Sequence, residues 1–230
     1  MSAAQPVVKI CCIASVAEAR MAIDAGAAAL GLVSAMPSGP GVIGDALIAE
    51  IAAMVEPPTD TFLLTARTRA EAIAAQHAHA RTTTLQLVDH VPHPELRRLR
   101  ELCPGVKLVQ VIHVRDETSV VEAQAAAPWV DALLLDSGNP HLAVKELGGT
   151  GRAHDWRLSR RIRDAVAPLP LYLAGGLRAD NVAEAIGTVQ PFGLDLCNGV
   201  RTAGRLDAGK LSAFFDAVRM GSTQRQASIK

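Results

Sequence analysis

Aromatic residues are scarce in this chain: four Phe, two Trp and one Tyr make up 3% of its 230 residues. Proteins that hold nucleic-acid bases stack them on aromatic side chains, so this scarcity argues against a base-binding surface. The chain also lacks a net charge, because 23 Lys and Arg balance 23 Asp and Glu. A neutral chain has no overall field that attracts DNA or an anionic membrane. We therefore expect a small-molecule partner, with no nucleic acid and no membrane.

Long apolar runs are absent as well. No stretch reaches the roughly 18 to 20 residues that a membrane-spanning helix needs. The N-terminal segment MSAAQPVVK lacks the basic and apolar regions of a secretory signal, and this pattern predicts a cytoplasmic protein. The four cysteines, Cys11, Cys12, Cys103 and Cys197, form neither a C-x-x-C motif nor a zinc-ligand spacing, so we expect reduced thiols and no metal.

Eight short runs rich in Val, Ile and Leu alternate with segments of helical spacing. The expected strands are residues 7–12, 28–33, 61–65, 84–88, 107–114, 130–136, 169–175 and 192–197. The expected helices are residues 15–26, 44–55, 68–80, 94–103, 117–127, 155–166, 179–189 and 207–219. The strand runs are continuous, as in strands of a parallel sheet that is covered on both faces. Eight such units of even length predict an α/β fold with a single (β/α)8 TIM barrel, and an open doubly wound sheet is the alternative.

The barrel is expected to fill residues 1–220 as one domain, and the polar segment 221–230 to be a disordered C-terminal tail. Ser15, Asp45 and Asp180 stand where N-caps belong, and Gly26 stands where a helix ends.

A phosphate site is predicted at the C-terminal end of the barrel, where the active sites of such barrels lie. The segment LAGGLRADNVAEA at 173–185 ends a strand in Gly175 and Gly176 and then enters a helix. Glycines allow backbone N–H groups to approach an anion, and a helix start adds the positive end of its dipole. Asn198 and Gly199 form a similar turn after the last strand. These turns favour a phosphate monoester, although the glycines could also serve only as tight turns.

Two residue types at the same end of the barrel suit acid and base catalysis. Asp136 ends the sixth strand, and a carboxyl group in a partly desolvated pocket can serve as a general acid, although a solvated turn residue is the alternative. Lys9 and Cys11 share one face of the first strand, with Cys12 on the other. A thiol near a lysine or a phosphate cradle loses its proton more readily and can then act as a base. Which of the two cysteines faces the site stays open.

Six motifs occur in order along the chain: KICCI, LQLVD, LLLD, GGTGRAHDW, LAGGLRADNV and DLCNGVR. Together they resemble the phosphoribosylanthranilate isomerases of tryptophan biosynthesis, over about residues 8–219. That family catalyses an Amadori rearrangement of an aminoaldose phosphate to an aminoketose phosphate, an intramolecular oxidoreduction that needs no metal and no organic cofactor. The resemblance implies the same activity here, with a small phosphorylated sugar as substrate.

The resemblance also implies roles for individual residues. Cys11 would be the base that takes the proton from C2 of the sugar, and Asp136 would be the acid that protonates the ring oxygen. A further set would bind the substrate and its phosphate: Lys9, Gly149, Gly175, Gly176, Asp195, Asn198 and Gly199. The loop from Gly138 to His154 is the expected lid.

The chain departs from the family pattern on one side of the expected site. After the second strand the family usually carries K-S-P-R-Y, whose arginine holds the anthranilate carboxylate, but residues 37–41 read PSGPG. The family's Q-L-H-G becomes QLVD, which replaces the histidine with Val88, and the glycine of K-I-C-G-I becomes Cys12. We infer a changed amine specificity, or substitute anchors among Arg152, His90 and His113.

Three alternatives stay open at this point. One is another phosphosugar reaction, such as an epimerase or aldolase-like step, on the same phosphate cradle. A second is a non-catalytic barrel that binds a phosphorylated ligand. The third is a metal site built from His90, His93 and His113. The oligomeric state does not follow from the sequence.

Overall fold

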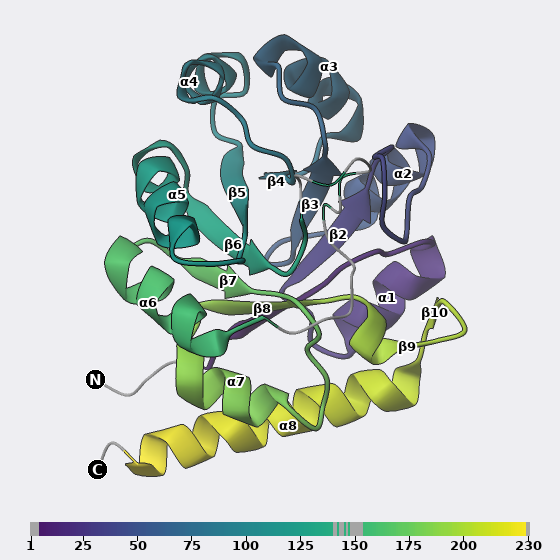
Figure 1. Cartoon of the computed structure of the whole chain (residues 1–230). Coiled ribbons are helices and arrows are strands. Elements are labelled where there is room, and N and C mark those ends of the chain that lie inside the picture. The colour runs from purple at the N-terminus through teal and green to yellow at the C-terminus, as the bar shows by residue number, and fades with distance from the viewer. Residues whose placement is uncertain (1–4, 140–141, 143–144, 146, 148–153, 229–230) are drawn as a thin grey trace.

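In the computed structural model, residues 5–139, 142, 145, 147 and 154–228 are described, with side chains described as far as Thr223. Eight parallel strands close into a barrel and helices surround it (Figure 1). The (β/α)8 prediction is confirmed, and the doubly wound alternative is wrong.

All eight expected strands are present. They are β1 Val7–Ile10, β2 Ala29–Val33, β3 Asp60–Thr65, β4 Thr84–Leu87, β5 Lys107–His113, β6 Ala132–Asp136, β7 Leu171–Leu173 and β8 Gly193–Leu196. The expected helices are α1 Val16–Asp24, α2 Asp45–Met54, α3 Ala70–Ala80, α4 His93–Leu102, α5 Thr118–Ala126, α6 Trp156–Val166, α7 Val182–Val189 and α8 Ala208–Ser228. Four short elements that were not predicted complete the described part: the 3-10 helices η1 Ala127–Trp129 and η2 Asn198–Val200, and the hairpin strands β9 Arg201–Thr202 and β10 Arg205–Leu206.

The barrel closes between its first and last strands. Strand β1 pairs with β8 in a register that runs from Val7 opposite Gly193 to Ile10 opposite Leu196. The residues after β1 and after β8 therefore emerge side by side at the C-terminal end of the barrel.

Alternate side chains of the strands pack inward and outward, which explains why the apolar runs are continuous. One buried cluster lies between strands and helices, and a second, which includes Phe62 and Tyr172, fills the barrel interior. The Phe62 and Tyr172 rings meet edge to face with centroids 5.8 Å apart. Gly193 leaves room for this packing, since a Cβ there would lie 2.5 Å from the Tyr172 ring.

Two of the four predicted helix boundaries are confirmed. Ser15 caps α1 by accepting a hydrogen bond from the Glu18 N–H at 3.1 Å. Gly26 follows the end of α1 with φ of 103°, in the left-handed region that glycine adopts freely.

The other two predicted caps are wrong by one residue. Gly44 is the N-cap of α2, and Asp45 is its first helical residue, where its charge still favours the positive end of the helix dipole. Asn181 is the N-cap of α7, and Asp180 instead lies in the turn before it.

The C-terminal segment differs from the expectation as well. Helix α8 continues to Ser228 in place of the disordered tail expected from 221 onward. Gly221 and Ser222 are buried, and a Cβ on Gly221 would lie 2.9 Å from the Cα of Ala183 in α7. The contact with α7 at Gly221 thus accounts for the helix continuing past residue 220. Among the helices of the described residues, none is both long and apolar enough to cross a bilayer.

Candidate active site

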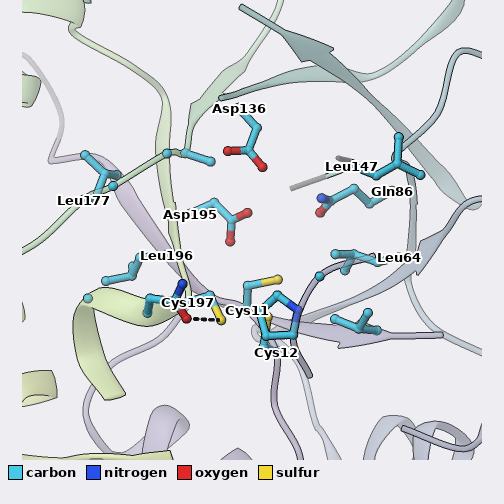
Figure 2. Close-up of a pocket in the computed structure, with 18 of the residues that line it drawn as sticks. Cys11, Cys12, Leu64, Gln86, Asp136, Leu147, Leu177, Asp195, Leu196 and Cys197 are labelled. Carbon is cyan, nitrogen blue, oxygen red and sulfur yellow. Dashed lines mark hydrogen bonds between the residues drawn. The ribbon is translucent and has the colours of Figure 1, made fainter. Parts of the chain in front are cut away.

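A pocket lies at the C-terminal ends of the barrel strands, where the sequence predicted the active site. The strand ends and loops that follow β1, β2, β3, β4, β6, β7 and β8 contribute to it. In Figure 2 the carboxylates of Asp136 and Asp195 and the thiol of Cys11 point into the same space. The pocket therefore brings a carboxylic acid and a thiol together, as acid and base catalysis on one bound molecule requires.

Asp136 ends β6 and is half-buried, with its carboxylate accepting a hydrogen bond from the Ser137 N–H at 2.7 Å. Burial raises the pKa of Asp136 to about 6, against the opposing effect of the Ser137 N–H. The negative charge of Asp195 raises it further, and Lys9 lowers it. A carboxyl group with this pKa is protonated in a useful fraction of molecules near neutral pH, so Asp136 can donate a proton.

Both Cys11 and Cys12 line the pocket, which answers the question of which one faces it. Cys12 has φ of 61°, and this left-handed turn brings its side chain to the pocket instead of the opposite face of the strand. The Cys12 side chain lies against Gly41, where a Cβ would be 2.4 Å from the Cys12 Cβ. Strand alternation could not reveal this, because alternation holds only while the backbone remains extended.

Two glycine turns form the expected phosphate side. Gly175 and Gly176 have φ of 83° and 63°, and both line the pocket together with Asn198 and Gly199. A Cβ on Gly199 would lie 2.0 Å from the Leu177 carbonyl oxygen, so the turns after β7 and β8 touch there. This arrangement leaves backbone open to an anion, as a phosphate cradle requires.

The segment that precedes α7 holds the glycine turn of the phosphate side in place through hydrogen bonds. The Asn181 side chain accepts a hydrogen bond from the Arg178 N–H at 2.8 Å and donates one to the Gly176 carbonyl at 3.0 Å. Arg178 itself lines the pocket. The asparagine thus fixes the glycine turn to the helix that follows it.

Lys9 lies beneath the pocket and does not line it. Its fully buried ammonium group donates to Asp195 at 2.8 Å and lies 5.2 Å from the centre of the Phe62 ring. Burial lowers the pKa of Lys9, but the Asp195 carboxylate outweighs this effect and raises the pKa above its ordinary value. Lys9 thus carries a fixed positive charge that holds Asp195, which does line the pocket.

The side opposite the glycine turns is mainly apolar. Val33, Met36, Pro40, Leu64 and Leu147 line it, together with Gln86. Gln86 is 3% exposed and its Oε1 has no hydrogen-bond partner among the described residues, so this wall offers one unused acceptor. Among the pocket-lining residues that the structure describes, Arg178 on the phosphate side is the only cation.

The two expected substitute anchors that the structure describes, His90 and His113, do not line the pocket. His113 is buried, and its Nε2 lies 3.0 Å from the Val88 carbonyl oxygen, while His90 is exposed. His93 stacks on Trp129 with ring centroids 5.3 Å apart. Within the described ranges, no three His, Cys, Asp or Glu side chains are placed to hold a metal ion. Gly149, Arg152 and most of the expected lid lie outside the described residues.

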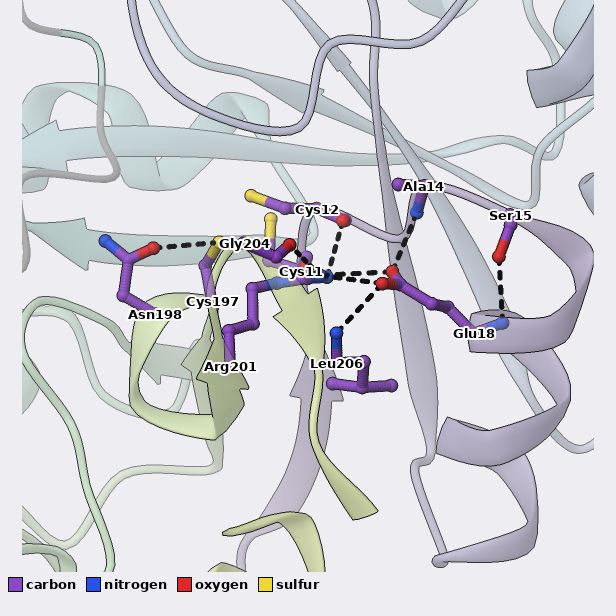
Figure 3. A network of polar contacts seen from close by, with 10 residues as sticks. All are labelled: Cys11, Cys12, Ala14, Ser15, Glu18, Cys197, Asn198, Arg201, Gly204 and Leu206. Carbon is purple, nitrogen blue, oxygen red and sulfur yellow. Dashed lines mark hydrogen bonds and ion pairs between the residues drawn. The ribbon is translucent and has the colours of Figure 1, made fainter.

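Sequence reasoning missed a pair of charged residues beside the two cysteines. Arg201 is buried, and its guanidinium donates to the carbonyl oxygens of Cys11 at 3.2 Å and Cys12 at 2.5 Å (Figure 3). Glu18 accepts hydrogen bonds from Arg201 at 3.0 and 3.1 Å and from the Ala14 N–H at 3.0 Å. The Ser-x-x-Glu spacing of Ser15 and Glu18 signals a capping box, but it does not reveal the arginine.

Comparison with known proteins shows the family of the chain. The family model described as N-(5'phosphoribosyl)anthranilate (PRA) isomerase matches residues 8–217. The N-(5'-phosphoribosyl)anthranilate isomerase of Synechococcus elongatus is 31% identical over 219 residues, which cover 94% of this chain and 97% of that protein. The N-(5'-phosphoribosyl)anthranilate isomerase 1 of Methanosarcina mazei is 32% identical over 228 residues, with coverage of 92% and 94%.

Solved structures show the same likeness. The phosphoribosyl anthranilate isomerase of Thermotoga maritima superposes with a TM-score of 0.80 at 25% identity and covers 94% of this chain and 99% of that one. The protein TrpF of Jonesia denitrificans superposes with a TM-score of 0.71 at 27% identity, with coverage of 96% and 99%. Since both the family model and these relatives extend over nearly the whole chain, it belongs to the N-(5'-phosphoribosyl)anthranilate isomerase family.

Proposed function

We propose that this chain catalyses the aldose–ketose isomerisation of its family, with Cys11 as the base and Asp136 as the acid. The substrate is an N-substituted phosphoribosylamine, of which N-(5'-phosphoribosyl)anthranilate is the reference case. The observation that carries the proposal is the shared pocket of Cys11 and Asp136, with a glycine cradle beside them. A cytoplasmic location remains a prediction from the sequence.

The proposed reaction starts from the phosphate, which the turns at Gly175, Gly176 and Gly199 hold through backbone N–H groups. Asp136 then gives its proton to the ring oxygen, so the C1–O bond breaks and a protonated Schiff base forms at C1. Cys11, as thiolate, removes the proton from C2, and the electron pair moves toward C1 to give an enolamine. Tautomerisation of the enolamine yields the aminoketose. Only protons move between protein and substrate, so the two side chains supply the chemistry.

The apolar wall opposite the glycine turns supports a second candidate substrate for the same reaction, in which the amine differs from anthranilate. An arginine holds a carboxylate through two charge-assisted hydrogen bonds, and the described residues of the apolar wall include no arginine or lysine. Pro40 occupies the position at which the family's K-S-P-R-Y carries its arginine. An amine without a carboxylate would suit the apolar wall and the unpaired Gln86 oxygen better than anthranilate does.

The first experiment follows the loss of anthranilate-type fluorescence when freshly made phosphoribosylanthranilate is mixed with the protein. Cys11→Ala and Asp136→Ala should both abolish turnover, whereas Cys103→Ala, at the end of α4 and away from the pocket, should retain it. If the wild-type protein converts phosphoribosylanthranilate and either the Cys11 or the Asp136 variant keeps full activity, the assigned roles are wrong.

The amine preference has its own test in the variant Pro40→Arg. This substitution places a cation on the apolar wall, so it should lower KM for phosphoribosylanthranilate with little change in kcat. A wild-type protein that already turns over this substrate with a KM unaffected by Pro40→Arg would contradict the second candidate.

A further inference from the structure

Gln86 presents to the pocket a buried hydrogen-bond acceptor that nothing in the described part of the chain satisfies. Its side chain is 3% exposed, and its Oε1 has no hydrogen-bond partner among the described residues. Its register neighbours are Leu64 on β3 and Val109 on β5, which both belong to the buried apolar cluster of the barrel interior. Buried polar groups normally have a partner, because leaving one without costs free energy. Since the flanking strands offer apolar side chains at this level, the donor has to come from the pocket, toward which the amide points in Figure 2.

The order of the strands determines which end of a bound sugar reaches Gln86. In the closed barrel of eight strands, β4 lies opposite β8. The glycine turns of the phosphate cradle follow β7 and β8, whereas Gln86 lies on β4. A pentose 5-phosphate held in the cradle therefore extends across the mouth of the barrel toward β4. The end farthest from the phosphate is C1, which carries the amine.

The proposed acid and base flank this line on opposite sides. Asp136 ends β6, on the arc of strands that runs from β4 to β8 through β5, β6 and β7. Cys11 follows β1, on the other arc, which runs through β1, β2 and β3. Each of them meets the middle of the sugar from its own side, and Gln86 is left to meet the nitrogen at the far end.

The amine nitrogen changes its charge during the reaction, and this change gives an acceptor something to do. When the C1–O bond breaks, the nitrogen lone pair forms the C1=N bond, and the N–H becomes cationic. A hydrogen bond from a cationic N–H is roughly twice as strong as one between neutral groups. When the C2 proton leaves, an electron pair returns to the nitrogen and the charge disappears. An acceptor beside the nitrogen therefore stabilises the protonated Schiff base more than it stabilises substrate or product.

We propose that Gln86 is a third catalytic residue, whose Oε1 accepts a hydrogen bond from the amine N–H and stabilises the protonated Schiff base. Gln86 forms no covalent bond and transfers no proton. The effect on turnover rests on the proposed function, whereas the preference for a cationic N–H at this position is a property of binding alone. The contact serves any secondary phosphoribosylamine, whatever its aglycone.

The binding test compares two stable open-chain analogues by calorimetry. One is 1-benzylamino-1-deoxyribitol 5-phosphate, whose secondary amine is cationic at neutral pH, and the other is the matching benzyl ether, which has no N–H. Gln86→Met keeps the length of the side chain but removes the acceptor. The preference for the amine over the ether should fall by roughly 10- to 100-fold in this variant. Gln86→Glu keeps an acceptor oxygen and should retain the preference.

The turnover test uses the same variants with a phosphoribosylamine that the wild type converts. Gln86→Met should lower kcat by roughly 10- to 100-fold and change KM less, because the hydrogen bond strengthens only after the substrate has bound. Inorganic phosphate should bind this variant as it binds the wild type. Urea denaturation should show no loss of stability, since an apolar side chain of similar length replaces an unpaired buried amide.

Four outcomes separate the proposal from its alternatives. A large loss of stability in Gln86→Met would give Gln86 a structural role, and equal losses of amine and ether affinity would leave it only a steric contact. An unchanged amine preference would mean that a buried water satisfies the oxygen, and each of these three results overturns the proposal. An unchanged kcat also overturns it but leaves the proposed isomerase intact. If the preference disappears as expected and the wild type converts no phosphoribosylamine, the contact is supported and the proposed function fails.

Discussion

Arg201 and Glu18 form a buried ion pair, with Nη1 3.0 Å from Oε1, although 183 positions separate them in the chain. The pair ties the start of the β9–β10 hairpin to helix α1. Because the guanidinium also donates to the carbonyls of Cys11 and Cys12, the pair holds the backbone turn that presents the proposed base. Arg201 is thus a positioning residue, which acts on the site through the backbone of β1.

Arg201→Gln should lower both stability and turnover. Removing one partner of a buried ion pair costs about 3–5 kcal/mol of unfolding free energy, because the other charge is left buried and unpaired. Urea denaturation measures this loss, and kcat should fall more than KM rises, since the cysteine turn loosens while the phosphate cradle stays. The exposed Arg205 supplies the control, and Arg205→Gln should cost under about 0.5 kcal/mol. Equal losses for the two variants would show that the pair does not hold the turn.

The strands and helices could be predicted because their signal is local. Each strand is a continuous apolar run that is buried on both faces. Each helix has apolar residues spaced three or four positions apart. The continuation of α8 past residue 220 was not predicted for the opposite reason: the polar residues there carry no local sign that Gly221 packs on Ala183 in α7. The caps at Gly44 and Asn181 were missed by one residue, because Asp45 and Asp180 fit the same local pattern.

The residues of the site also fall into two groups, those that a local sequence pattern reveals and those that depend on the folded structure. The glycine turns and Asp136 lie at strand ends, so the barrel rule selects them from the sequence. The orientation of Cys12 depends on a positive φ, and the Glu18–Arg201 pair depends on β1 and β8 lying side by side. Neither feature has a sequence pattern of its own, which is why both emerged only from the structure.

Gly199→Ala should damage the phosphate cradle. The added Cβ would lie 2.0 Å from the Leu177 carbonyl oxygen, so the turns after β7 and β8 must separate. We expect weaker binding of inorganic phosphate and a higher KM, measured by calorimetry and by steady-state kinetics.

Gly187 in α7 is the matched control, because a Cβ there meets nothing within 4 Å. Gly187→Ala should leave phosphate binding unchanged and stabilise the helix by about 0.5–1 kcal/mol. Unchanged phosphate affinity in Gly199→Ala would mean that phosphate binds elsewhere.

Lys9→Met should destabilise the barrel more than the size of the side chain suggests. The substitution leaves Asp195 buried without its cation, and such a loss costs about 3–5 kcal/mol in unfolding free energy. Lys9→Met combined with Asp195→Leu removes both charges, so urea denaturation should recover much of the stability. A double variant as unstable as the sum of the single variants would show that Lys9 and Asp195 do not act as a pair.

The raised pKa of Asp136 predicts how activity depends on pH. If Asp136 must be protonated to open the ring, the ratio of kcat/KM between the wild type and Asp136→Asn falls tenfold per pH unit once the pH exceeds about 6, because both proteins need the Cys11 thiolate and only the wild type loses the Asp136 proton. Asp136→Asn should lose about 10²–10⁴-fold in kcat, the usual contribution of a general acid. A ratio that stays constant between pH 5 and pH 8 would assign the acid to another group.

The same pKa predicts the pH dependence of stability. Folding raises the pKa of Asp136 from 3.8 to about 6, so between these values the folded state binds more protons than the unfolded state. Stability from this group is full below pH 4 and is lost as the pH rises through 6, because unfolding then releases the carboxylate from its buried site. Asp136→Asn does not titrate, so the difference in unfolding free energy between the two proteins should change across this window and be constant outside it. A constant difference from pH 4 to pH 7 would show that Asp136 has an ordinary pKa, and the acid in ring opening would then be a different residue.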